Sequence, residues 1–387
     1  MSGHRTARVL VYTHRWLGIA LGVLFVVWFV SGIIMMYARM PALSIAERLA
    51  RLPAINSAHI RTLPPAPAEG DITRLAIGTL EGRPVFRVSA RGRTDLVFAD
   101  TGDPLPPVDA DQAIRIARAF LGGVTEVRYD ARLTDADQWS FGIRGRMPVH
   151  RIIVEDAAGT RLYVTENGGE VVLKTTASGR FWAWTGAVLH WIYFTPLRRN
   201  AALWNEVIVW SSIAGTVMCI VRILWGLWRI APMRGYRLRD HRQWSPYAGW
   251  MRWHHYSGII FGIVTTTWIF SGLLSMDPWD WHPSTAPTRD QRARVSGGSL
   301  ALSDLSVEKL RKAIDAFTPD HPKEIEITRF RGHYFVVAGA GVVSLDEPKF
   351  GAKDQLRADL MVGAANIAMQ SVPIEGMTWL DQYDAYY

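Results

Sequence analysis

The chain has 387 residues, of which 49% are hydrophobic and 17 are tryptophan, so it is too long for one typical domain and too apolar in places to be uniformly water-soluble. Its formal net charge of +8 is compatible with nucleic-acid binding or with membrane topology, and the positions of the charges decide between the two. Cys219 is the single cysteine, which excludes a disulfide framework and a thiolate metal site.

The first apolar segment, Trp16–Tyr37, is 22 residues long. It predicts a membrane-spanning helix, because about 20 apolar residues are needed to cross the hydrocarbon core. No small-residue cleavage site follows it, so we expect residues 1–37 to hold a short cytoplasmic N-terminus and a retained span. Residues 38–180 predict a small α+β domain. Here "GRPVFRVSARGRTDLVFADTGDPL" alternates as strands do, and "DADQAIRIARAFLGG" has the Asp start and Gly-Gly end of a helix.

Two further segments reach membrane length. Residues 181–230 predict an interfacial helix and then a second span that starts near Trp204, and residues 254–277 predict a third span. Residues 231–253, between these spans, form a strongly basic loop. Residues 278–387 predict a second α+β domain, because "LSVEKLRKAIDAF" has a helical period and "KEIEITRFRGHYFVVAGAGVVSL" reads as strands.

The positions of the arginines indicate how the spans are oriented. Arginines cluster at the N-terminus and in the loop between the second and third spans, which predicts that both are cytoplasmic and that both α+β domains lie on the far side. Topology thereby explains the positive charge, and no motif in the chain indicates nucleic-acid binding.

The first and third spans are copies of one segment. Residues 14–36 and 254–276 align at a constant offset of 240, with eight identities in 23 positions and no gap. The shared residues include His14/His254, Gly18/Gly258, Gly22/Gly262, Trp28/Trp268, Ser31/Ser271, Gly32/Gly272 and Met36/Met276. A counterpart of His190 would lie at about position 430, beyond the last residue. Either the second unit has no return helix or the chain is a truncated form, and both alternatives stay open.

The repeated histidine and glycines predict a cofactor site. They fall close to one helical face, so two such helices related by a pseudo-twofold axis would present two imidazoles across a slot lined by small residues. Helical bundles hold the iron and the planar ring of b-type haem in this way. The candidate iron ligands are His14, His190 and His254, His255 is a further cofactor-binding candidate, and the arginines expected to pair with the propionates are Arg15, Arg222 and Arg252.

A plainer interpretation accounts for each of these residues taken alone. Small residues recur wherever membrane helices pack, and a histidine at a helix end can sit among lipid headgroups. Arg222 can extend its side chain to the cytoplasmic surface, and the aromatic residues near His190 are typical of a membrane border. Repetition of histidine with the same glycines at a fixed offset favours the haem interpretation.

With these residues assembled, the chain resembles the PepSY-associated transmembrane family. The stretches that carry the resemblance are "YTHRWLGIALGVLFVVWFVSG", "AVLHWIYFTPL", "WHHYSGIIFGIVTTTWIFSG" and "WLDQYDAYY". The strand-turn elements "VFADTGDPL" and "RLYVTENGGEVV" also look like the ends of PepSY units. The second departs from the aspartate-containing turn of such units, because Glu166-Asn167-Gly168-Gly169 stands in its place.

The resemblance implies a fold and a function. It implies a bacterial inner-membrane protein with a membrane α-helical bundle, a cytoplasmic N-terminus and periplasmic PepSY-like α+β domains. Members are often iron-regulated, and some are ferric-siderophore reductases with b haems between their membrane helices. The resemblance therefore implies one or two b haems, a ferric-siderophore substrate and an electron donor in the cytoplasm or the membrane. The family's membrane histidines match His14, His190 and His254/His255.

Two other functions stay open at this point. One is a haem-free membrane protein whose PepSY-like domains bind and regulate a periplasmic peptide or protease. The other is an electron-transfer subunit that carries haem but serves a separate oxidoreductase. The Soret absorbance of bound haem distinguishes the first alternative from the other functions, and ferric reductase activity distinguishes the second.

Overall fold

The computed structural model describes residues 2–368, apart from residues 124, 232, 234, 239–240, 282–285, 318–320, 340, 347–350, 352 and 354–357. The stretch "WLDQYDAYY" lies outside the described residues. The chain divides into two compact units, and each is built from two separate stretches of sequence. The helical unit comprises Met1–Met40 and Ser178–Ser284, and the sheet unit comprises Pro41–Ala177 and Thr285–Tyr387.

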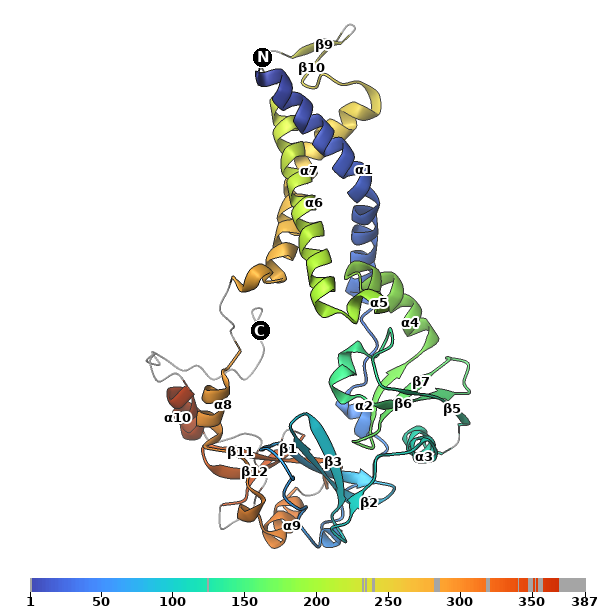
Figure 1. The fold of residues 1–387 in the computed structure, drawn as a ribbon, viewed down its shortest axis with the longest axis vertical. Helices are drawn as coiled ribbons and strands as arrows, with labels where there is room; N and C mark the ends of the chain where they lie inside the picture. The colour runs from blue at the N-terminus through green and yellow to red at the C-terminus, as the bar shows by residue number, and fades with distance from the viewer. Residues whose placement is uncertain are drawn as a thin grey trace. The chain divides into compact units, whose positions relative to one another are not determined.

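Three long helices dominate the helical unit: α1 (Ser2–Tyr37), α6 (Ala201–Arg229) and α7 (Gly249–Ser275) (Figure 1). All three are long and apolar enough to cross a membrane, so the three predicted spans are confirmed as candidate membrane helices. α6 packs against both α1 and α7. Shorter elements of this region are α4 (Ala177–Ala183), η3 (Trp184–Val188), α5 (Thr195–Arg198), β9 (Tyr236–Leu238), β10 (His241–Gln243) and η4 (Pro278–Asp280). The β9–β10 hairpin and the N-terminus lie at the same end of the three helices (Figure 1).

Glycines set the close approach of α6 and α7. A Cβ placed on Gly226 of α6 would lie only 2.8 Å from Cγ1 of Ile259. One placed on Gly262 of α7 would lie 3.2 Å from Cγ1 of Ile223. Small residues at a crossing let helix backbones pack tightly where no hydrophobic effect between helices can drive association. Part of the repeated glycine pattern therefore serves helix packing.

The sheet unit contains two antiparallel sheets. The larger has the strand order β13-β12-β11-β1-β2-β3-β4, and the smaller has the order β5-β6-β7-β8. The bounds are β1 (Ile72–Leu80), β2 (Arg83–Ala90), β3 (Arg93–Phe98), β4 (Pro104–Leu105), β5 (Val127–Leu133), β6 (Val149–Val154), β7 (Arg161–Thr165), β8 (Val171–Thr175), β11 (Ile325–Phe330), β12 (His333–Ala338) and β13 (Gly341–Ser344). The helices are α2 (Ile45–Leu49), η1 (Ser57–His59), α3 (Ala110–Leu121), η2 (Phe141–Arg146), α8 (Arg289–Ser296), η5 (Leu302–Asp304), α9 (Val307–Asp315) and α10 (Ala358–Ala368).

The two outer stretches of sequence share one sheet. β1 from the first stretch pairs with β11 from the second, with Leu75 opposite Ile327. The core beside this pairing includes Phe86 of β2 and Leu310 and Ile314 of α9, which are all buried. The two predicted α+β segments thus form one sheet with one core. The second stretch supplies both a strand that pairs with β1 and the helix α9 that packs on it.

Local signals account for several of these elements. α3 begins after Asp109, whose carboxylate accepts a hydrogen bond from the Gln112 N–H at 2.8 Å, and it ends at Gly122 in the left-handed conformation. Two-residue turns of the Xaa-Gly type join neighbouring strands, as at Glu81-Gly82, where both residues have positive φ. Such turns match the twist of an antiparallel hairpin.

Candidate functional site

Two of the predicted ligands face each other across the helical unit. The ring centroids of His14 on α1 and His254 on α7 are 6.1 Å apart, with an angle of 41° between the ring planes. Nδ1 of His14 is buried and makes no hydrogen bond, although the Met218 backbone carbonyl lies close to the ring. An imidazole nitrogen without a partner in an apolar surrounding retains the capacity to bind a ligand.

The Arg222 side chain of α6 lies beside this histidine pair. Its guanidinium Nη2 donates a hydrogen bond to the backbone carbonyl of His254 at 3.0 Å, while its Nε is buried without a hydrogen bond. The residue is 8% exposed, and no carboxylate among the described residues pairs with it. A buried cation without a counter-ion is costly at low dielectric, so this position is suited to a negatively charged group.

The glycine after each histidine has a different neighbour in the two copies. A Cβ on Gly258 would lie 3.1 Å from Nε of Arg222, so this glycine makes room for the guanidinium. A Cβ on Gly18 would lie 3.8 Å from Sδ of Met218, which is an ordinary contact. The predicted slot beside His254 is therefore occupied at Gly258 by an arginine, which brings a positive charge to the two rings.

His255 has a structural position. It is fully buried, its Nδ1 lies 2.8 Å from the Ser245 hydroxyl, and its Nε2 lies 2.9 Å from the Gly226 carbonyl. Both ring nitrogens are thus engaged, and neither is left for an iron. This ring ties α7 to α6 and to the loop that precedes α7.

The other two predicted arginines lie elsewhere on the helix surfaces. Arg15 is exposed, with its guanidinium carbon 6.0 Å from the ring of Trp16. Arg252 donates a hydrogen bond to the Gln243 side chain at 3.1 Å. Of the three arginines, the structure brings Arg222 to the histidine pair.

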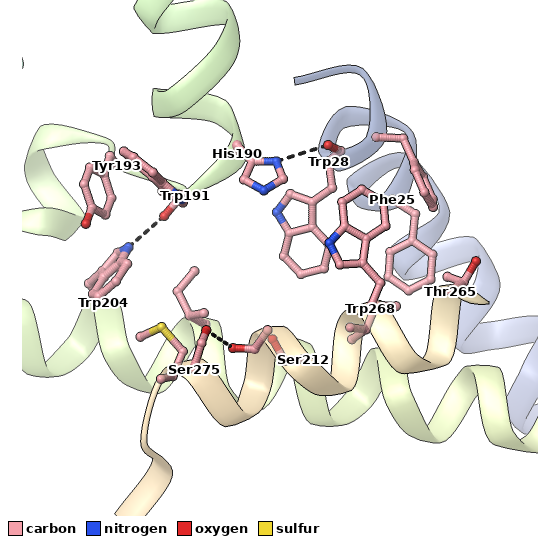
Figure 2. A pocket seen from close by; sticks show the side chains of 15 residues that line it. Phe25, Trp28, His190, Trp191, Tyr193, Trp204, Ser212, Thr265, Trp268 and Ser275 are labelled. Carbon is pink, nitrogen blue, oxygen red and sulfur yellow. Dashed lines mark hydrogen bonds between the residues drawn. The ribbon is translucent and has the colours of Figure 1, made fainter. Parts of the chain in front are cut away.

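His190 occupies a second site, toward the other end of α1. The preceding element η3 lies against α1, and Gly186 permits this approach, because a Cβ there would lie 3.1 Å from Cγ2 of Ile34. The imidazole then rests on Gly32, where a Cβ would come within 3.1 Å of the ring. Nδ1 of His190 lies 3.1 Å from the Trp28 backbone carbonyl (Figure 2). A proton on Nδ1 satisfies this contact and leaves Nε2 as a free lone pair, as in ligating histidines that donate their other nitrogen to a carbonyl.

An aromatic cavity of about 320 Å³ opens beside His190. Figure 2 shows His190 with the indoles of Trp28 and Trp268 on one side of it, and Trp191, Tyr193 and Trp204 on the other. The Trp28 indole N–H is buried and makes no hydrogen bond. The cavity therefore contains an unpaired donor as well as a histidine, which are features of a ligand-binding site rather than of a packed core.

Aromatic side chains cluster at the His190 end of the helices. Phe25 and Trp28 stack with ring centroids 6.0 Å apart, and Phe29 meets Trp268 edge-on at 4.9 Å. His14 and Trp28 are 14 positions apart on one helix, which corresponds to about 21 Å along its axis. His14 and His190 therefore cannot share one ion.

Sequence reasoning missed the groups that orient His190. The acceptor is the backbone carbonyl of Trp28, and the Ser31 hydroxyl lies 3.4 Å from Nδ1. A backbone carbonyl has no sequence signature. The repeated Ser-Gly pair was a usable signal, because Ser31 and Gly32 both lie under the imidazole and both recur in α7.

The comparison with protein families agrees with these elements. The chain matches the model of the PepSY-associated TM region over residues 11–363. These residues include most of α1, all of α6 and α7, the first stretch of the sheet unit and its second stretch as far as residue 363. No curated protein and no solved structure matches the chain at a significant level. The three helices and the family match indicate a membrane protein. The family model covers nearly the whole chain, and the chain therefore belongs to the PepSY-associated transmembrane family.

Proposed function

We propose that this protein holds a b-type haem between His14 and His254 and passes electrons across the bacterial inner membrane to a ferric siderophore. The observation that carries the proposal is the pair of facing imidazoles, 6.1 Å apart between ring centroids. Metal–imidazole bonds of about 2 Å place two rings that share one ion with centroids roughly 6 Å apart. His14 and His254 are therefore spaced as two imidazoles that would hold one iron between them.

The residues around the pair fit a haem in two further respects. The His14 Nδ1 atom lacks a hydrogen bond, and a ligand bond would satisfy a ring nitrogen that burial otherwise leaves unpaired. The guanidinium of Arg222 has no carboxylate partner among the described residues, so it suits an anionic group, and haem propionates are such groups. Haem at this site would supply reversible one-electron exchange between ferric and ferrous iron.

The remaining roles belong to side chains of the chain itself. Arg222 holds a positive charge beside the site and favours electron entry. The aromatic residues that line the cavity beside His190 give that end of the path an apolar surrounding. His190, oriented by the Trp28 carbonyl, presents Nε2 to the aromatic cavity, where it would hold a second haem or contact the exit of the electron path.

The charge distribution supports the proposed direction of transfer. Arginines cluster at the N-terminus and in the β9–β10 loop, which favours a cytoplasmic position for that end and a periplasmic position for the sheet unit. A cytoplasmic or membrane-bound donor would then supply electrons near His14, and the ferric substrate would accept them near His190. Reduction releases iron because siderophore oxygens are hard donors that hold Fe(III) more tightly than Fe(II).

The first test is the visible spectrum of the detergent-purified protein, oxidised and dithionite-reduced, with the haem quantified as its pyridine complex. We expect a low-spin b-type spectrum in the wild type and its loss in His14→Ala and in His254→Ala. His255→Gln is the matched control, because it changes the adjacent histidine, whose two nitrogens are already engaged, and it should keep the spectrum.

The outcomes separate the candidate functions. A colourless wild type, purified from cells supplied with haem, would refute the proposal and favour the haem-free regulator of a periplasmic peptide or protease. Haem without ferric-siderophore reductase activity in membrane vesicles would favour a subunit that serves a separate oxidoreductase. Haem that survives both His14→Ala and His254→Ala would place the cofactor elsewhere.

Redox titration tests the role of Arg222. Arg222→Gln removes a positive charge beside the iron, so we expect the midpoint potential to fall, because the oxidised form carries one more positive charge. Arg222→Lys keeps the charge and should restore most of the potential. An unchanged potential in Arg222→Gln would show that this arginine serves helix packing alone.

A further inference from the structure

The sheet unit contains a polar cavity of about 240 Å³ that both of its sheets line. Arg74 of β1 and Arg87 of β2 come from the larger sheet. Arg146 of η2, and Asn167 and Glu170 in the turn between β7 and β8, come from the region of the smaller sheet. Three arginines thus converge on one cavity, and a single carboxylate lies among them.

Arg87 is built into the floor of this cavity. Its side chain is 3% exposed, and its Nε donates a hydrogen bond to the Gly168 carbonyl at 2.9 Å. A Cβ on Gly78 would lie 2.5 Å from Nη1 of Arg87, so the strand β1 has a glycine where the guanidinium crosses it. Glu170, with a side chain 9% exposed, lies 3.1 Å from Arg87 Nε. Burial at this level fixes the guanidinium in place before any ligand binds.

The neighbouring ion pairs leave the cavity with an excess of positive charge. Arg48 forms a bidentate pair with Glu324 at 2.6 and 2.9 Å, and Arg74 lies 3.0 Å from Glu326. Burial opposes ionisation of Glu324, but hydrogen bonds from Arg48 outweigh it and hold the pKa of Glu324 below its usual range. The four arginines of this network, at positions 48, 74, 87 and 146, face three glutamates, at positions 170, 324 and 326.

Arg146 is the arginine with the weakest partner. Its Nη1 lies 3.9 Å from Glu170 Oε2, at the limit of an ion pair, and its side chain is 55% exposed. Glu170 also serves Arg48 at 3.3 Å and Arg87 at 3.1 Å. One carboxylate shared by three guanidinium groups cannot satisfy them all, so the positive charge in excess is concentrated at Arg146.

We propose that this cavity binds a small polycarboxylate anion, with Arg146 as its main contact and Arg87 as the fixed charge beneath it. Guanidinium groups match the planar, bidentate geometry of carboxylates, and Asn167 and the hydroxyls of Ser89 and Thr94 offer further polar contacts along the wall. The volume is below the roughly 300–1,000 Å³ typical of drug-sized ligands, which favours a small molecule over a folded partner.

The role of this cavity as a substrate site rests on the proposed function. A small ferric chelate whose iron is held by carboxylates would be the natural occupant on the substrate side. Binding itself does not need haem. The test therefore uses the full chain carrying both His14→Ala and His254→Ala, so that failure of haem binding and failure of this site give different results.

The experiment is isothermal titration calorimetry at fixed ionic strength with citrate, ferric citrate and inorganic phosphate as probes. We expect citrate and ferric citrate to bind, and Arg146→Gln to weaken both by about tenfold, as the loss of one charge-assisted contact would. Glu170→Gln should tighten binding, because it removes the negative charge from the cavity. Arg128→Gln is the control, since Arg128 pairs with Glu155 on the exposed surface of the same unit.

Arg146→Gln and Glu170→Gln are expected to change the affinity for citrate in opposite directions, which distinguishes the proposal from a loss of folding. A misfolded unit would weaken binding in both cavity variants, whereas the proposal requires one to weaken and the other to tighten. The proposal fails if citrate does not bind, if Arg146→Gln binds like the wild type, or if Glu170→Gln weakens binding. Phosphate binding as tightly as citrate would also overturn it, because the cavity would then select charge alone.

Discussion

Residues 14–36 of α1 and residues 254–276, which follow α7 to its C-cap Met276, share eight identities but have different neighbours. Gly32 is buried beneath the His190 imidazole, whereas nothing lies within 4 Å of a Cβ placed on Gly272. Ser31 is 1% exposed beside the same ring, whereas Ser271 is exposed. The corresponding surface of α7 lines the aromatic cavity. The surface of α1 at Ser31 and Gly32 thus contacts His190, whereas the aligned surface of α7 at Ser271 and Gly272 is open to a ligand.

At the ends of α1 and α7 that carry His14 and His254, it is the α7 glycine that is closely contacted. Here the glycine of α7, Gly258, is crowded by Arg222, and the glycine of α1, Gly18, has only a loose contact with Met218. α6 lies between the copies and contributes both neighbours. The repeated sequence therefore determines the two helices and the positions of their histidines. The unrepeated segments, α6 and the segment that carries His190, determine which glycine of each aligned pair has a close neighbour. Substitutions at aligned positions test this directly, because each variant has a built-in control.

The largest difference is expected between His255→Ala and its aligned counterpart Arg15→Ala. Loss of the buried imidazole removes its hydrogen bonds to the Ser245 hydroxyl and the Gly226 carbonyl and leaves a cavity in its place, so we expect a destabilisation of about 3 kcal/mol. Arg15 is exposed, and its replacement should cost less than about 0.5 kcal/mol. Thermal unfolding in detergent, followed by tryptophan fluorescence at one scan rate, measures both. Equal midpoints would contradict the structural position of His255.

The next comparison is Gly32→Val against Gly272→Val. Both changes place the same β-branched residue in a helix, so their intrinsic costs cancel. Valine at position 32 collides with His190, where even a Cβ would lie at 3.1 Å, and overpacking of this kind costs about 2 kcal/mol. Valine at position 272 extends into open space. We expect the unfolding midpoint to fall in the first variant alone, and a similar fall in both would show that the two surfaces are equally filled.

A smaller effect is expected from Gly258→Ala against Gly18→Ala. Alanine favours a helix over glycine by about 1 kcal/mol, and Gly18→Ala should gain most of that. At position 258 the added methyl meets Arg222, which cancels the gain. The difference between the two unfolding midpoints is the measured quantity. If Gly258→Ala proves the more stable variant, the guanidinium does not pack on this glycine.

The smallest difference is expected between Ser31→Ala and Ser271→Ala. Each hydroxyl donates to the carbonyl three residues earlier, at 3.2 Å for Ser31 and 2.8 Å for Ser271. Ser31 alone also lies near a second polar group, Nδ1 of His190 at 3.4 Å. We expect an additional loss of about 0.5 kcal/mol for Ser31→Ala. Repeated thermal unfolding of the two variants side by side measures this difference. A larger loss of stability for Ser271→Ala would contradict an interaction between the Ser31 hydroxyl and His190.

Local sequence signals predicted much of this fold. The apolar segments located three long helices, and Asp109 and Gly122 mark the two ends of α3 as the sequence indicates. The helices nevertheless begin earlier than the apolar segments, α1 at Ser2 and α7 at Gly249, because polar residues extend a helix as readily as apolar ones.

Long-range contacts were beyond the sequence signal. Pairing of β1 with β11 joins residues about 250 positions apart, and no local pattern specifies it. For the candidate site, the repeat predicted that His14 and His254 lie opposite each other, and their ring centroids are 6.1 Å apart, while their role as ligands stays a prediction. The repeat could not indicate that both ring nitrogens of His255 are hydrogen-bonded, or that Gly258 accommodates Arg222. Both features depend on α6 and on the loop between α6 and α7.

The shared sheet has a consequence for biosynthesis. β1 ends at Leu80 and its partner β11 begins at Ile325, so about 240 residues, including two long apolar helices, are made between them. At roughly 5–20 residues per second, the edge of β1 stays unpaired for about 10–50 seconds on every nascent chain. An open edge rich in apolar residues is an aggregation hazard throughout that interval. Chaperone demand during synthesis should therefore depend on translation speed between these two strands.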